Sequence, residues 1–138
     1  MRDSSPTTAF RLVTLLLPPL VVMAVLFYFS SLPSTAHYPA WEVLLRKLGH
    51  ASGYALLVFT WWRTFRGLLP SSHRFVVVLA AVAASLAYAV TDELHQTLVT
   101  GRHGTPIDVL IDSLGITAVA GLAVRRSRPP GDVGTAQP

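Results

Sequence analysis

The most continuous apolar stretch lies near the start of the chain, at residues 12–29 (LVTLLLPPLVVMAVLFYF), and contains no charged residue. An α-helix of that length rises about 27 Å, close to the roughly 30 Å thickness of a bilayer's hydrocarbon core. Pro18 and Pro19 interrupt the stretch. Within a membrane, neighbouring helices can satisfy the backbone groups that a proline frees. The pattern therefore predicts a membrane-spanning helix that is kinked rather than broken.

A secretory signal peptide is the competing interpretation of this stretch. Arg2 and Arg11 precede it, and Ser34-Thr35-Ala36 resembles a small-residue cleavage site. The apolar region of a signal peptide runs about 7–15 residues, which is shorter than the stretch found here. Length therefore favours an uncleaved helix.

Three further apolar stretches follow the first. They lie at about residues 48–65, 75–95 and 106–124. Each is marginal by hydropathy alone, but together with the first stretch they predict an all-α fold, an integral membrane four-helix bundle. Small residues would let these helices approach closely, namely the alanine-rich run at 80–87 and, in the last stretch, Gly115 and Gly121.

The distribution of basic residues orients the predicted bundle. Four spans place both termini and the loop between the second and third spans on one side, which carries eight of the eleven basic residues. Because basic residues concentrate on the cytoplasmic side of membrane proteins, we expect both termini to be cytoplasmic. The expected organisation is a cytoplasmic segment at 1–11, a transmembrane domain at 12–124 and a disordered cytoplasmic tail at 125–138.

Composition agrees with this interpretation and excludes several classes of function. Only 13% of the residues are charged, against about 25% in soluble domains, so polar surface is too scarce for a water-soluble globule. The absence of cysteine excludes disulfide scaffolds, Cys-ligated metal centres and thiol nucleophiles. The chain has no phosphate-binding loop, dinucleotide fingerprint or nucleic-acid motif. We therefore expect the lipid bilayer as a partner, and neither nucleic acid nor a cofactor.

The unusual polar residues gather where the second stretch begins, the third ends and the fourth begins. Helical spacing places three sets each on one face: Lys47, His50 and Tyr54; Asp92, His95 and Gln96; Asp108, Asp112 and Gly115. Because a charge facing lipid is costly, we expect these faces to turn toward one another, at the extracytoplasmic ends of the helices. Glu93 lies off the Asp92 face, which suggests a solvated position. Arg102 lies in a glycine-flanked loop that can fold back over the cluster.

Structural interpretations of the same residues stay open. Asp108 follows Thr-Pro-Ile, so a role in starting a helix explains it equally well. Asp112 lies one turn deeper and needs a partner, which we expect to be Lys47, Arg102 or a histidine. Arg46 and Lys47 are also consistent with interfacial residues that extend to water. The whole set is therefore either a functional pocket or a buried ion-pair network that specifies helix packing.

Acid–base chemistry is the reaction that the cluster suggests most directly. A histidine beside carboxylates can transfer protons near neutral pH, so the catalytic candidates are His95 as acid and base, with Asp92 or Asp108 orienting it. The ligand-binding candidates are Lys47, His50, Tyr54, Glu93, Gln96, Arg102 and Asp112, with Arg102 suited to an anionic group such as phosphate. A metal site built from His50, His95, Asp92 and Asp108 is a weaker alternative, because the spacing is not that of a zinc-protease motif.

The order and spacing of these residues closely resemble those of the VanZ-like family. The resemblance rests on Phe29-Ser30-Ser31, on Arg46-Lys47-Leu48-Gly49-His50 with Tyr54, on Thr91-Asp92-Glu93-Leu94-His95-Gln96, on Gly101-Arg102, and on Asp108 with Asp112 and Gly115. It spans about residues 12–124, and it departs from the family pattern at Asp112, where asparagine is more usual. The resemblance implies a small multi-pass protein of the bacterial inner membrane, in a family whose namesake is associated with teicoplanin resistance. No settled biochemical activity comes with it.

Two functions follow from the pocket and the resemblance. An enzyme acting on a cell-envelope lipid, lipid-linked glycan or glycopeptide at the outer leaflet would use His95 for proton transfer, and Arg102 with Lys47 for an anionic head group. A non-catalytic module would bind or redistribute the same ligands, or act as a scaffold for a partner protein, without proton transfer. The residues identify no particular protein partner, and both functions stay open at this point.

Overall fold

A computed structural model describes residues 8–34, 39–102 and 106–125. Throughout these ranges the regular structure is helical, with α1 at Thr8–Ser31, α2 at Ala40–Leu68, α3 at Arg74–Gln96 and α4 at Pro106–Arg125. The prediction of an all-α four-helix protein is therefore confirmed. The expected start of the second helix near residue 48 is wrong, because α2 begins at Ala40, directly after Pro39. Glu42 lies in the first turn of α2, where a negative charge stabilises the positive end of the helix dipole.

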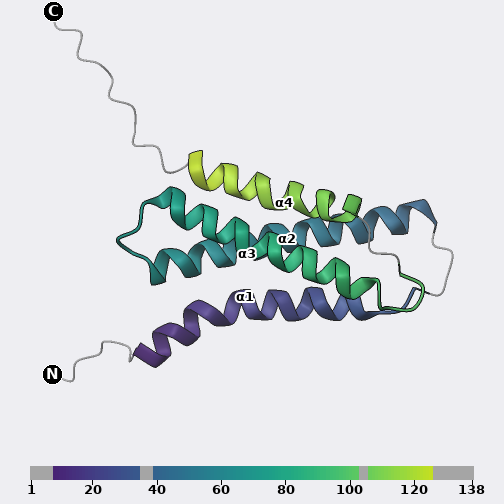
Figure 1. Cartoon of the computed structure of the whole chain (residues 1–138), viewed down its shortest axis with the longest axis horizontal. Helices are drawn as coiled ribbons and strands as arrows, with labels where there is room; N and C mark the ends of the chain where they lie inside the picture. Colours follow the sequence, from purple (N-terminus) through teal and green to yellow (C-terminus); the bar gives the residue numbers. More distant parts are fainter. Residues whose placement is uncertain (1–7, 35–38, 103–105, 126–138) are drawn as a thin grey trace, which may run out of the picture.

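The helices lie alongside one another, with two on opposite sides of a central pair (Figure 1). α2 contacts each of the other three helices, whereas α1 and α4 contact only α2 and α3. One end of the bundle, which we call the site end, is where α1 and α3 finish and α2 and α4 begin. At the opposite end lie the start of α1, the α2–α3 connection and the end of α4 (Figure 1).

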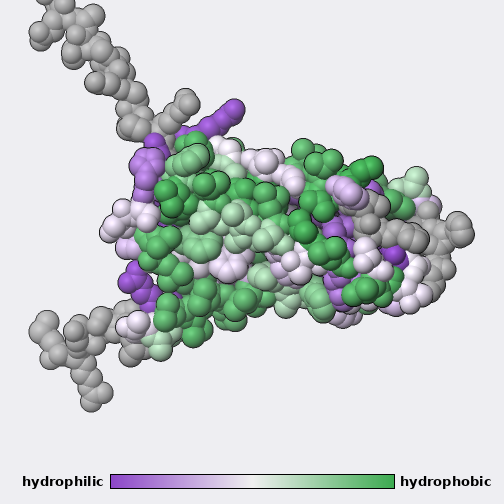
Figure 2. Space-filling model, viewed as in Figure 1, coloured by the Kyte–Doolittle hydropathy of each residue, from purple (hydrophilic) through white to green (hydrophobic). Residues whose placement is uncertain are grey.

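The surface of the bundle is that of a membrane protein. α1, α3 and α4 are each long and apolar enough to span a bilayer, while α2 falls short in hydropathy because polar and charged residues interrupt both of its ends. Large apolar side chains such as Leu17, Leu79 and Leu114 are exposed on the sides of the bundle. Hydrophilic residues gather toward its two ends (Figure 2). The buried core is small and centres on Tyr54 and Leu57.

The two prolines of α1 are accommodated as the sequence predicts. Each proline removes the hydrogen bond that the carbonyl four residues earlier would accept, and α1 bends within its N-terminal half (Figure 1). The carbonyl freed by Pro19, that of Leu15, accepts a 2.6 Å hydrogen bond from the Thr64 hydroxyl of α2. Neighbouring Arg63 donates a 3.2 Å hydrogen bond from Nη1 to the backbone carbonyl of Thr14, the carbonyl that Pro18 frees. α2 therefore replaces both lost backbone partners.

α2 and α4 approach each other closely at Gly115. A Cβ atom at this position would collide with the backbone carbonyl oxygen of Ala51 and lie 3.0 Å from its carbonyl carbon. The expectation of close packing is therefore confirmed at Gly115. It is wrong for Gly121, where a Cβ would meet nothing within 4 Å. This contact brings the first turns of α4 against α2 and thereby assembles the site end.

Candidate functional site

A cavity of about 970 Å³ lies between α1 and α2 toward the site end. Its apolar wall comes from Val21, Val22, Val25, Leu26 and Phe29 of α1, from Leu32 directly after α1, and from Val43, Leu45 and Leu56 of α2. Gly49 and Gly53 of α2 also line it, and a Cβ at Gly49 would meet only open space. Its polar lining comes from Glu42, Arg46, Lys47, His50, Glu93, Gln96, Arg102, Asp108 and Asp112, all near the site end. The cavity is therefore amphiphilic.

Lys47 and Asp108 join α2 to α4 at the polar end of the cavity. Lys47 Nζ lies 2.7 Å from Asp108 Oδ1, and both side chains stay partly exposed. Asp108 is also the acid in the first turn of α4, as the helix-start interpretation requires. The threonine proposed to cap that helix, Thr105, falls outside the described residues. Lys47, one of the three partners considered for Asp112, thus pairs with Asp108 instead.

Two further carboxylates line the cavity from different helices. Asp112 of α4 is 2% exposed and Glu93 of α3 is 7% exposed, and the two interact electrostatically. The expectation of a solvated Glu93 is wrong, because α3 packs against both α2 and α4 and buries that face. Within the described part of the chain, Asp112 forms neither a hydrogen bond nor an ion pair. Two buried carboxyl groups from different helices therefore line the cavity.

Asp92 and Gln96 form a separate polar network with α1. Asp92 Oδ2 accepts hydrogen bonds from the Ser30 hydroxyl at 2.6 Å and from Gln96 Nε2 at 3.2 Å, and Gln96 also donates to Ser30. Among the described residues, Asp92 Oδ1 and the Tyr54 hydroxyl are buried without a hydrogen-bond partner. Neither Asp92 nor Tyr54 lines the cavity. Sequence reasoning did not assign Ser30 a role, although it lies in one of the motifs that carry the family resemblance.

His95 lies away from the cavity, on the side of α3 that faces α1. Its Nε2 is 3.1 Å from the Ser31 hydroxyl, and its ring stacks on Phe27 with the centroids 4.5 Å apart. Successive helical residues are rotated by about 100°, so His95 and Gln96 fall on opposite flanks of Asp92. All three side chains contact the end of α1, and of the three only Gln96 lines the cavity. The histidine that lines the cavity is His50, on α2.

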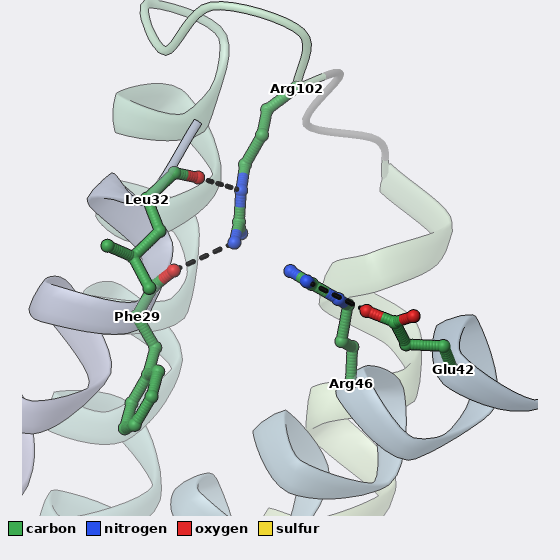
Figure 3. Close-up of polar contacts among 5 residues, drawn as sticks. All are labelled: Phe29, Leu32, Glu42, Arg46 and Arg102. Carbon is green, nitrogen blue, oxygen red and sulfur yellow. Dashed lines mark hydrogen bonds and ion pairs between the residues drawn. The ribbon is translucent and has the colours of Figure 1, made fainter. Parts of the chain in front are cut away.

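Arg102 folds back over the end of α1 and also lines the cavity. Its Nε donates to the carbonyl of Leu32 at 3.0 Å, and its Nη2 donates to the carbonyl of Phe29 at 2.7 Å. These are orphan carbonyls at the end of a helix, so the contact caps α1. Arg46 points toward Arg102 from α2, and its Nη2 lies 3.2 Å from Glu42 Oε1 (Figure 3).

Sequence reasoning missed the contribution of Glu42 and Arg46 to the cavity. Their spacing of four residues places them on one helix face, and this was the available signal. The alternative metal site is not assembled. No group of three His, Asp or Glu side chains is placed to hold an ion in residues 8–34, 39–102 and 106–125. One of its proposed ligands, His95, faces α1 instead.

The helices, the apolar surface and the amphiphilic cavity define a multi-pass α-helical membrane protein with an internal polar site. A family model described as VanZ/LLP1 matches residues 4–126. The chain therefore belongs to the VanZ/LLP1 family, as the resemblance in its motifs predicts. No curated protein and no solved structure matches the chain.

Proposed function

We propose that this protein binds an amphiphilic molecule of the cell envelope, a lipid, lipid-linked glycan or glycopeptide, in the cavity between α1 and α2. The observation that carries the proposal is the division of the cavity lining into an apolar wall and a charged end. An acyl chain gains by leaving water for the apolar wall, and a polar head group needs the charged end. A volume of about 970 Å³ lies within the range of small-molecule sites, so it holds a head group and part of a chain.

In this proposal, the charged end of the cavity lies at the outer leaflet of the bacterial inner membrane. Among the described residues, five basic side chains lie at the opposite end and three at the site end. Those at the opposite end are Arg11, Arg63, Arg66, Arg74 and Arg125. This excess supports a cytoplasmic location for that end and for both termini.

The position of His95 favours binding over proton transfer by that histidine. A general base must reach the proton that it abstracts, and His95 faces α1 rather than the cavity. The residues at the charged end are arranged as ion pairs and caps, which suit recognition of a head group.

The decisive experiment fills the cavity without disturbing the bundle. Gly49→Leu places a side chain in the open cavity, whereas the matched variant Gly121→Leu adds the same side chain where a Cβ also meets nothing within 4 Å. Each protein is reconstituted in liposomes that contain a phospholipid with a photoactivatable acyl chain. Cross-links are then mapped by mass spectrometry.

We expect cross-links to the facing walls of α1 and α2 in the unaltered protein and in Gly121→Leu, and their loss in Gly49→Leu. Labelling of the exposed surface of α3 and α4 serves as the internal reference for bulk lipid. If Gly49→Leu leaves the α1–α2 labelling unchanged, the cavity holds no lipid and the proposal is wrong.

A further inference from the structure

The charges at the polar end of the cavity specify the head group of the bound amphiphile. Resting on the proposed function, we infer that this head group is zwitterionic, with a primary ammonium group between Glu93 and Asp112 and a phosphate group between Arg46 and Arg102. The sequence alone predicts neither a ligand-binding role for Arg46 nor a cation-binding role for the two carboxylates.

The carboxylate half of the site comes from two different helices. Asp112 is buried, lines the cavity and forms neither a hydrogen bond nor an ion pair among the described residues. Glu93 lines the same cavity from α3. The nearby lysine, Lys47, is already held by Asp108 at 2.7 Å. A buried carboxylate needs a cation or several donors, so for Asp112 the ligand is the natural source.

The arginine half lies nearer the ends of the helices. Arg46 and Arg102 both line the cavity, and their guanidinium groups point toward one another from α2 and from the loop after α3 (Figure 3). Two backbone carbonyls at the end of α1 and directly after it hold Arg102 in place, and Glu42 orients Arg46. Two guanidinium groups that face each other favour an anion that both can contact. Their planar arrays of N–H donors match the oxygens of a phosphate.

The two halves together match a phosphoethanolamine type of head group. A primary ammonium has three N–H donors and can serve both carboxylates, whereas the quaternary ammonium of choline has none. A phosphoglycerol head group supplies the anion but no cation for the carboxylates. The acyl chains of such a lipid would follow the apolar wall toward Val21 and Leu56.

The test titrates the delipidated full-length protein, in detergent micelles, with three phospholipids of identical acyl chains. Phosphatidylethanolamine, phosphatidylcholine and phosphatidylglycerol are compared by native mass spectrometry. We expect phosphatidylethanolamine to bind at least about tenfold more tightly than the other two, which corresponds to about 1.4 kcal/mol. Because the protein is unaltered, this comparison does not depend on the folding of any variant.

Substitutions then assign the two halves. Glu93→Gln and Asp112→Asn should lower phosphatidylethanolamine binding to the level of phosphatidylcholine, while the affinity for phosphatidylcholine itself stays within about twofold. Arg46→Gln should weaken all three lipids, because each carries a phosphate. The control is Arg66→Gln, on the same helix but outside the cavity, which should change none of them.

The outcomes separate this inference from the proposed function. Equal affinities for the three lipids, all lost in Gly49→Leu, would overturn the zwitterionic head group and leave the lipid cavity standing. A preference for phosphatidylglycerol would overturn the ammonium site. If no lipid binds, or if Gly49→Leu does not weaken binding, the proposed function itself fails.

Discussion

Replacing Gly115 by alanine should separate the two helices that assemble the site. The added methyl group would meet the backbone of α2 at Ala51 and Ala55, so no side-chain rotation can relieve the contact. The helices must instead move apart. Gly121→Ala is the matched control, since it makes the same change six residues later on α4, where the methyl group meets open space.

Two terms set the size of the effect. Overpacking a close contact costs about 1–3 kcal/mol of unfolding free energy. Replacing glycine by alanine within a helix returns about 0.5–1 kcal/mol. Gly115→Ala should therefore be destabilised by about 1–2 kcal/mol, while Gly121→Ala should be unchanged or slightly more stable. The difference between the variants removes the propensity term and isolates the steric cost.

The assay is unfolding of the purified protein in mixed micelles, with helicity followed as the fraction of sodium dodecyl sulfate increases. The transition midpoint of Gly115→Ala should fall below that of the unaltered protein, and the midpoint of Gly121→Ala should not. Lipid binding should weaken together with stability in Gly115→Ala, because α4 carries Asp108 and Asp112. Equal midpoints for the two alanine variants would refute the assignment of Gly115 as the point of backbone contact.

Three further predictions test other parts of the structure. Thr64→Val should cost about 1–2 kcal/mol of unfolding free energy, because it removes the donor to the Leu15 carbonyl that Pro19 leaves unbonded. Thr64→Ser keeps the hydroxyl and should retain most of the stability, and micellar unfolding of both variants measures the difference. A double-mutant cycle of Lys47→Met and Asp108→Asn should give a coupling of up to about 1 kcal/mol, because both side chains are partly exposed; a coupling of zero in the same assay would show that the pair does not join α2 to α4. His95→Gln should leave phospholipid binding within about twofold of the unaltered protein, since His95 lies outside the cavity, and a large loss by native mass spectrometry would return His95 to the site.

The sequence by itself determined the class of protein and the position of its polar residues along the chain. The length and hydropathy of an apolar stretch are one-dimensional properties, so they predicted four helices and a membrane environment without any knowledge of packing. The sequence also predicted that Pro18 and Pro19 would leave the carbonyls four residues earlier without a donor from α1. A neighbouring helix must then supply the donors, wherever that helix lies. The gathering of charges at the site end followed from the order of the helices alone.

Tertiary structure decided which of these residues meet. Helical periodicity fixes the angle between two side chains about their own axis, but the rotation of that helix against its neighbours is set by packing. For this reason Glu93 is buried at the cavity although its position on α3 suggested solvent, and His95 lies outside the cavity although its neighbour Gln96 lines it. The partner of Lys47 was decided in the same way, because Asp108 and Asp112 share a face of α4 and only their depth against α2 distinguishes them. The backbone contact at Gly115 sets that depth.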